Sequence, residues 1–244
     1  MKSRFSSLPV LFLLLLCSPF ATLLAAPPPK PLSLEARVAQ LEALLADVSR
    51  VNDPNTGQDT LRFEDMNVQI VNGSGTTYSA TGTGNLIIGY NETRRNPEDC
   101  YPPVDCGNRR SGSHILVGGS GNNYTSFGGM IVGIFNETSA PFASISGGAL
   151  NNSSGWFSSI SGGDFNIANA EGTSISGGSY NTASFLYSWV GGGQWNTATG
   201  ARGSSVSGGA HNTASGENSS VSGGNGRTAT DTDDWAAGSF LEDF

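Results

Sequence analysis

Ser144-Ile145-Ser146-Gly147-Gly148 is a phrase that the chain repeats, with Ile or Val at its centre, at residues 159–163, 174–178, 205–209 and 220–224. A second phrase, Asn-Thr-Ala-(Ser/Thr), alternates with it and begins at Asn181, Asn196 and Asn212. The central aliphatic residues are separated by steps of 15, 15, 15, 16 and 15: Ile145, Ile160, Ile175, Val190, Val206 and Val221. A fixed period of this length is typical of a solenoid.

Each phrase alternates polar and small apolar residues, which is the pattern of a strand with one buried face. From Ile160 onwards, one inward alanine lies between successive Ile or Val residues, so that each coil holds two very short strands and two corners. The Gly-Gly pairs and the asparagines supply residues that accept the left-handed backbone angles of tight corners. The sequence therefore predicts an all-β fold, a slim parallel β-solenoid of about 15 residues per coil.

The 244 residues carry 34 glycines, 13% charged residues and a net charge of −8. The residue pattern predicts six segments: a signal peptide (1–26), a Pro-rich spacer (27–33), a short coiled-coil helix (34–52), a neck (53–83), the solenoid (84–234) and a C-terminal cap (235–244). In the first segment, positive residues precede an apolar run and a small-residue cleavage region. We therefore expect a secreted, extracellular or cell-surface protein with no transmembrane span after signal removal.

The expected helix carries an apolar seam with steps of 4, 3, 4 and 3, at Leu34, Val38, Leu41, Leu45 and Val48. Such a seam is typical of a short oligomerising coiled coil, which we favour over an amphipathic helix that lies on the solenoid. Further along, Met66–Val71 alternates with period two and predicts a strand in the neck.

The solenoid begins before its obvious repeats. Steps of 15 residues back from Ile145 reach Met130 and Ile115, and Leu86, Ile88, Val117 and Val132 add apolar residues where later coils have serine. We expect this end to be covered by the neck or by a neighbouring protomer.

An inserted loop (92–111) contains Cys100 and Cys106, which in an exported protein most simply form a disulfide. Four arginines flank these cysteines: Arg94, Arg95, Arg109 and Arg110. Two interpretations stay open, solvated charge and a recognition site grafted onto a regular scaffold.

No residue pattern indicates an enzyme. His114 and His211 each lie inside a repeat, without a nucleophile and an orienting acid that the sequence indicates. The negative net charge argues against nucleic acid as a partner. We expect no cofactor and no metal, and we interpret the acidic residues 231–234 as a solvated cap rather than a calcium site.

Two columns of side chains are candidate binding or interface surfaces. The first precedes the corner asparagines and includes Phe135, Phe165, Tyr180 and Trp195; it either packs against another protomer or stacks on sugar rings. The second flanks the inward alanines and includes Thr182, Thr197, Thr199, Thr213 and Thr228. These threonines are either ordinary solvent-facing strand residues or a grid that orders water, as in ice-binding solenoids.

The Ser-(Ile/Val)-Ser-Gly-Gly and Asn-Thr-Ala-(Ser/Thr) phrases over residues 84–230 resemble the heads of trimeric autotransporter adhesins. This resemblance implies a left-handed β-roll, a homotrimer and attachment to a host or matrix surface, with a glycan as one candidate ligand. Because the residues after the repeats do not resemble the C-terminal β-barrel anchor of that family, we expect a secreted or non-covalently attached relative. The same phrases are similar to plant antifreeze β-rolls built of Asn-Thr-Val-Ser-Gly units. We therefore expect a structural, adhesin-like protein, with an ice-binding or polysaccharide-binding solenoid as the alternative.

Overall fold

The computed structural model describes residues 31–94 and 107–238. It divides the chain into two compact units, Met1–Asn67 and Val68–Phe244, which are described separately. The expected signal peptide, most of the Pro-rich spacer, and Cys100 and Cys106 lie outside the described residues, and so does most of the expected cap.

Over residues 31–67, the described part of the first unit contains one helix, α1 (Leu34–Leu44). The Ser33 hydroxyl caps its first turn by accepting a hydrogen bond from the backbone N–H of Ala36 (3.3 Å). The helix is shorter than the expected 34–52, because residues 48–52 form a strand instead. Strand β1 (Val48–Asn52) pairs antiparallel with β2 (Asp59–Phe63). The turn between them holds Asp53, whose carboxylate accepts hydrogen bonds from the N–H groups of Asn55 and Thr56.

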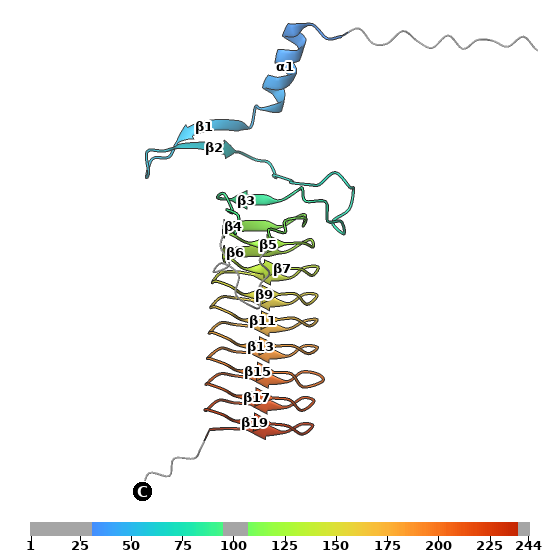
Figure 1. The fold of residues 1–244 in the computed structure, drawn as a ribbon. Coiled ribbons are helices and arrows are strands. Elements are labelled where there is room, and N and C mark those ends of the chain that lie inside the picture. The colour runs from blue at the N-terminus through green and yellow to red at the C-terminus, as the bar shows by residue number, and fades with distance from the viewer. Residues whose placement is uncertain (1–30, 95–106, 239–244) are drawn as a thin grey trace, which may run out of the picture. The chain divides into compact units, whose positions relative to one another are not determined.

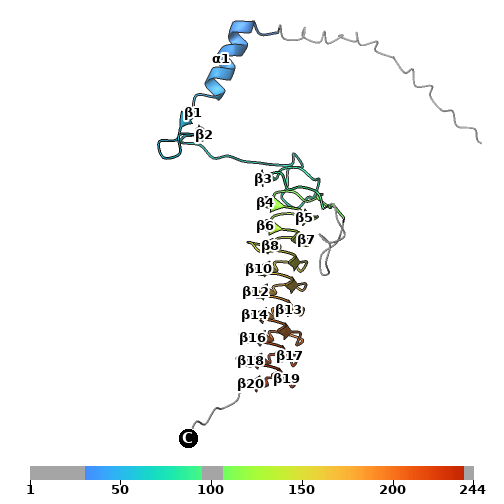
Figure 2. The same cartoon turned by 60° about the vertical axis from the view of Figure 1, so that its left-hand side comes forward.

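The second unit is a parallel β-solenoid, seen as a regular stack of coils in Figures 1 and 2. One face is a ten-stranded sheet: β3 (Leu86–Ile88), β4 (Leu116–Ser120), β6 (Met130–Ile134), β8 (Ser144–Ile145), β10 (Ser159–Ile160), β12 (Ser174–Ile175), β14 (Trp189–Val190), β16 (Ser205–Val206), β18 (Ser220–Val221) and β20 (Trp235–Ala236). The other is an eight-stranded sheet: β5 (Asn123–Tyr124), β7 (Glu137–Thr138), β9 (Asn152–Ser153), β11 (Ile167–Ala168), β13 (Thr182–Ala183), β15 (Thr197–Ala198), β17 (Thr213–Ala214) and β19 (Thr228–Ala229). No strand forms at the expected 66–71.

The strand register confirms the predicted coil. Ile145, Ile160 and Ile175 pair in succession in the ten-stranded sheet, and Ala168, Ala183 and Ala198 do so in the eight-stranded sheet. These inward side chains are 0–1% exposed and form one continuous core along the stack. The single 16-residue step comes from one extra residue in the corner at 199–203, compared with the equivalent corner at 184–187.

The first coils differ from the prediction. Val117 pairs with Ile131, and Ile131 pairs with Ile145, so these two coils have 14 residues rather than 15. Consequently Met130 faces outward, and Val117 points into the core with 0% exposure. Steps of 15 residues gave the wrong register here, because residues 130–132 are all apolar and show no alternation.

A column of buried asparagines joins the coils on the inside of the first corner, the corner that leads from the ten-stranded to the eight-stranded sheet. The side chain of Asn181 donates to the carbonyls of Gly177 in its own coil and Gly193 in the next (3.0 Å each). Its Oδ1 accepts from the backbone N–H of Asn196 (3.0 Å). Equivalent bonds recur along the stack, at Asn122, Asn136, Asn151, Asn166, Asn196 and Asn212. The column is therefore a structural amide ladder. The left-handed backbone angles that we expected of these asparagines belong instead to the residues before them, such as Tyr180 and Trp195.

This ladder generates a stability prediction. Replacing Asn181 with Ala removes three hydrogen bonds and leaves buried partners unsatisfied, at about 1 kcal/mol per bond, so we expect a loss of about 3 kcal/mol. Chemical denaturation followed by circular dichroism measures it. The matched control is Asn169→Ala, an exposed asparagine on the outer face, with an expected change within about 0.5 kcal/mol. Equal denaturation midpoints for the two variants would contradict the prediction.

Candidate functional site

Large side chains line the outside of the first corner in a file, which we call the first-corner ladder, and all of them except Leu150 carry a ring. Its members all have positive φ angles of 56–57°: Phe135, Leu150, Phe165, Tyr180, Trp195 and His211. The rings of Phe165 and Tyr180 stack at 4.7 Å and 2°, and those of Tyr180 and Trp195 at 4.2 Å and 7°. The ladder thus brings together the four aromatic residues that the sequence singled out.

The stacking decides which part of each ring is available to a partner. At centroid distances of 4.2–4.7 Å, neighbouring rings cover one another's faces. Tyr180 and Trp195 are nevertheless 36% and 47% exposed, so what they present to solvent is mainly their edges. A sugar ring that stacks on an aromatic side chain needs a ring face. The ladder therefore offers an edge-on apolar strip, which suits a flat partner better than an individual sugar ring.

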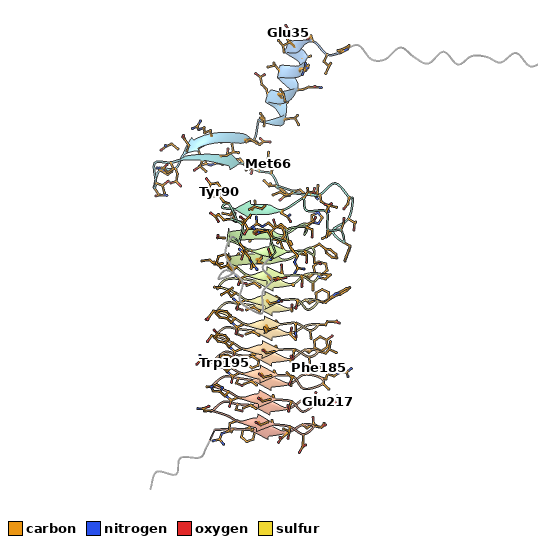
Figure 3. The ribbon with its side chains drawn as sticks, in the orientation of Figure 1. Glu35, Met66, Tyr90, Phe185, Trp195 and Glu217 are labelled. Carbon is orange, nitrogen blue, oxygen red and sulfur yellow. The ribbon has the colours of Figure 1, made fainter. Side chains whose placement is uncertain are left out.

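A second aromatic group lies at the second corner, which returns the chain from the eight-stranded to the ten-stranded sheet. Phe142 and Phe157 stack at 5.4 Å and 2°, and Phe127 and Tyr78 pack edge-on against Phe142. Tyr187 continues the file after a gap at Gly172. Figure 3 shows Phe185, from this corner, and Trp195, from the first, at opposite edges of the stack. The 15-residue spacing of Phe127, Phe142 and Phe157 was a readable signal that the sequence analysis missed.

The threonine columns lie in register on the outer face of the eight-stranded sheet. Thr182 pairs with Thr197, Thr197 with Thr213, and Thr213 with Thr228. The first three are partly buried and Thr228 is exposed. The columns span four coils only, because the preceding coil has Ile167 at the equivalent position.

Most of the four arginines that flank the cysteines form hydrogen bonds within the fold. Arg94 is 5% exposed; its guanidinium donates to the carbonyls of Gly121 (2.7 Å) and Asn136 (3.0 Å) and lies over the Phe135 ring. Arg110 donates to the Glu92 carbonyl (2.7 Å). Arg109 is exposed, and its backbone bonds to β5. Arg95 lies outside the described residues, together with the two cysteines.

Glu137 is a buried carboxyl beside these arginines, with 6% exposure. Burial raises the pKa of Glu137 above its ordinary value, and the charges of Arg109 and Arg94 partly oppose this shift. The folded chain therefore binds the proton of this carboxyl more tightly than the unfolded chain does.

A cavity of about 610 Å³ lies between the segment 69–77 and His114. His114 holds this segment in place, since its Nε2 accepts from the backbone N–H of Asn72 and its Nδ1 lies 3.3 Å from the Thr77 carbonyl oxygen. The lining is otherwise backbone, amide, hydroxyl and aliphatic groups, without a carboxylate or a thiol. The cavity thus shows a neck segment folded over the first coil rather than a catalytic arrangement.

No protein-family model matches the chain, and no curated protein matches it. Across the described residues, no group of three or more His, Cys, Asp or Glu side chains is placed to hold a metal ion. Within the same ranges, no helix is long and apolar enough to cross a membrane.

The raised pKa of Glu137 generates a prediction on pH dependence. A carboxyl with a raised folded-state pKa contributes stability below its unfolded pKa and loses that contribution as the pH rises through the folded value. We therefore expect the free energy of unfolding of Glu137→Gln, measured relative to that of the wild type, to increase as the pH rises from about 4 to about 7. Denaturation at several pH values measures this difference. Glu171→Gln, at an exposed corner, controls for the loss of one negative charge; the same trend in both variants would contradict the prediction.

Proposed function

We propose that this chain is an exported structural attachment protein, a trimeric β-roll that binds to a surface or matrix through the sides of its solenoid. The observation that carries the proposal is the first-corner ladder, in which four rings stack in succession with part of each ring exposed, at Phe165, Tyr180, Trp195 and His211. Binding through such a strip requires no catalytic groups, which agrees with the hydroxyl-rich, repetitive composition of the coils. Export rests on residues 1–26, and the left-handed coil on the resemblance to adhesin heads.

Trimer formation is supported by the apolar stripe of α1. Leu34, Val38 and Leu41 are 70%, 43% and 57% exposed, and no residue of α1 is buried within the chain. Exposed leucines at coiled-coil spacing favour a partner helix. With 11 residues, however, α1 is below the length of about 12–15 residues at which an isolated helix becomes marginally stable. A stable trimer therefore needs contacts from the solenoid as well.

This part of the proposal is tested by Leu41→Lys in the full chain. The substitution places a charge in the seam, and we expect the solution mass to shift from trimer towards monomer. Light scattering after size-exclusion chromatography measures the mass. Gln40→Lys, which adds the same charge outside the seam, is the matched control and is expected to stay trimeric. A monomeric wild-type chain would contradict the trimer outright.

The threonine columns support the alternative function, an ice-binding or polysaccharide-binding solenoid. Their hydroxyls repeat from coil to coil at about 4.8 Å, the spacing of neighbouring strands, and so form a regular array. Four coils make this array short, and Ser184 and Ser215 interrupt the second column of threonines. The array is the weaker of the two candidate surfaces.

One pair of variants separates the two functions. Trp195→Asn removes a ring but keeps a residue that tolerates positive φ, and Thr197→Lys disrupts the array two residues away. We expect Trp195→Asn to reduce retention of the full chain on immobilised matrix proteins and cell surfaces about tenfold, and Thr197→Lys to leave it unchanged. Reduced ice-crystal shaping or polysaccharide retention in Thr197→Lys alone would favour the alternative, and unchanged behaviour of both variants would contradict both functions.

A further inference from the structure

The outer face of the ten-stranded sheet carries no charged residue in any of its strands, from β3 to β20. In its later coils this face consists of paired serines, at residues 144 and 146, 159 and 161, 174 and 176, 205 and 207, and 220 and 222. Some of these serines bond from coil to coil, as Ser159 does with Ser174 and Ser205 with Ser220. We call this surface the uncharged face.

Towards the N-terminal end the uncharged face becomes apolar. Leu86, Leu116 and Met130 follow one another in register on its outside. Leu86, Ile88 and Ile134 are 45%, 63% and 49% exposed. In a single chain, this end of the uncharged face therefore exposes several large aliphatic side chains to solvent, an arrangement that marks interaction surfaces.

Trp189 stands where the other copies of the repeat have their first serine. Gly191 stands where they have the second serine, and its lack of a side chain leaves room for the indole. A Cβ atom at Gly191 would lie 2.8–2.9 Å from the Trp189 ring, so the serine that other coils place there would clash. The indole of Trp189 thus lies over Gly191, with its Nε1 3.4 Å from the Ser176 hydroxyl. Trp235 bonds in the same way to Ser222, 2.8 Å away. Both indoles are tied to the sheet by these bonds, and they are 38% and 65% exposed.

Most charges of the described solenoid lie elsewhere. Arg109, Arg110 and Glu137 belong to the eight-stranded side, and Glu171, Arg202, Glu217 and Asp231 to the second corner. Asp164 lies at the first-corner end of the face, in the bridge column that begins with Ile134. The chain has a net charge of −8, so two copies repel one another wherever their acidic parts meet. Copies can approach over the strands of the uncharged face without desolvating charge. The later coils of the eight-stranded sheet are also uncharged, but they lack the exposed aliphatic residues of β3 and β6.

We infer that the uncharged face packs against further copies of this chain. The inference rests on the proposed trimer and names the surface that forms it. Small serine side chains allow a close approach of the sheets, while the aliphatic residues of β3, β4 and β6 and the indoles of β14 and β20 supply the apolar contacts. The first-corner ladder and the charged second corner lie outside this face and stay available for attachment.

The size of the face explains why α1 is also needed. Ten strands at about 4.8 Å give a length of about 43 Å, and three residues of strand give a width of about 10 Å. The resulting area of about 430 Å² is below the roughly 800 Å² that each partner buries in a standard interface. Solenoid and helix are therefore expected to contribute jointly to association.

The test compares two serines of one coil in the full chain. Ser207 lies on the uncharged face next to Gly191, Ser215 lies on the outer face of the eight-stranded sheet, and both are exposed. We expect Ser207→Arg to weaken self-association more than about tenfold, because it buries an unpaired charge, and Ser215→Arg to leave it unchanged. Sedimentation equilibrium measures the association, and circular dichroism checks the fold.

A second variant shows whether a loss of association comes from the face itself or from misfolding. Trp189→Ser alone restores the residue of the repeat and keeps Gly191, where a Cβ atom would meet the backbone carbonyl oxygen of Ser207 as well as the indole. This variant is expected to fold normally and still to weaken association. Trimer loss in Leu41→Lys but not in either face variant would overturn the inference and leave the helix-based trimer standing. Unchanged mass with reduced retention on cellulose, chitin or matrix proteins would also overturn it, since the face would then bind a ligand rather than a copy of the chain.

Discussion

The buried amide ladder is the constraint on which the solenoid depends. Each asparagine joins three backbone groups across two coils, as Asn181 does with Gly177, Gly193 and Asn196. The slim core holds only one Ile or Val and one Ala per coil in the repeated region, so hydrophobic burial per coil is small. Directed hydrogen bonds at the first corner therefore fix the coil path. They also determine that the preceding residue turns outward, which places the rings of the first-corner ladder in file.

The regular part of the fold could be predicted because every level of the sequence agrees. Ile175 and Ala183 alternate with polar neighbours, Gly178 and Asn181 supply the corner, and the spacing repeats. The prediction was wrong where that agreement is lost. Met130-Ile131-Val132 offers no alternation, and only the pairing of Ile131 with Ile145 shows the 14-residue coil. At the N-terminal end, the heptad pattern continues through Val48, but this valine belongs to a hairpin that closes around Asp53.

The candidate surfaces were predicted less completely than the fold, for a different reason. The first-corner aromatics and the threonines follow the period and were found. The indole over Gly191 was missed, because the exchange of two serines for Trp189 and Gly191 looks like a lapse in the repeat until the structure shows the two residues in contact. Arg94 seemed free for recognition, yet its guanidinium is held by two carbonyls and the Phe135 ring. Contacts between distant segments determine both outcomes, and a periodic sequence does not reveal them.

The first corner shows how neighbouring rings offset the strain of their own backbone. Bulky residues at positive φ are strained, at a cost of the order of 1–3 kcal/mol each, whereas glycine adopts this conformation freely. Stacking contributes about 0.5–1.5 kcal/mol per pair beyond the free energy of the area that each ring buries. Gly172 and Gly203 fill the equivalent sites at the second corner without a ring. The stack thus offsets the strain within the chain, and the edges of Tyr180 and Trp195 that stay exposed are the part available for the proposed contact with another molecule.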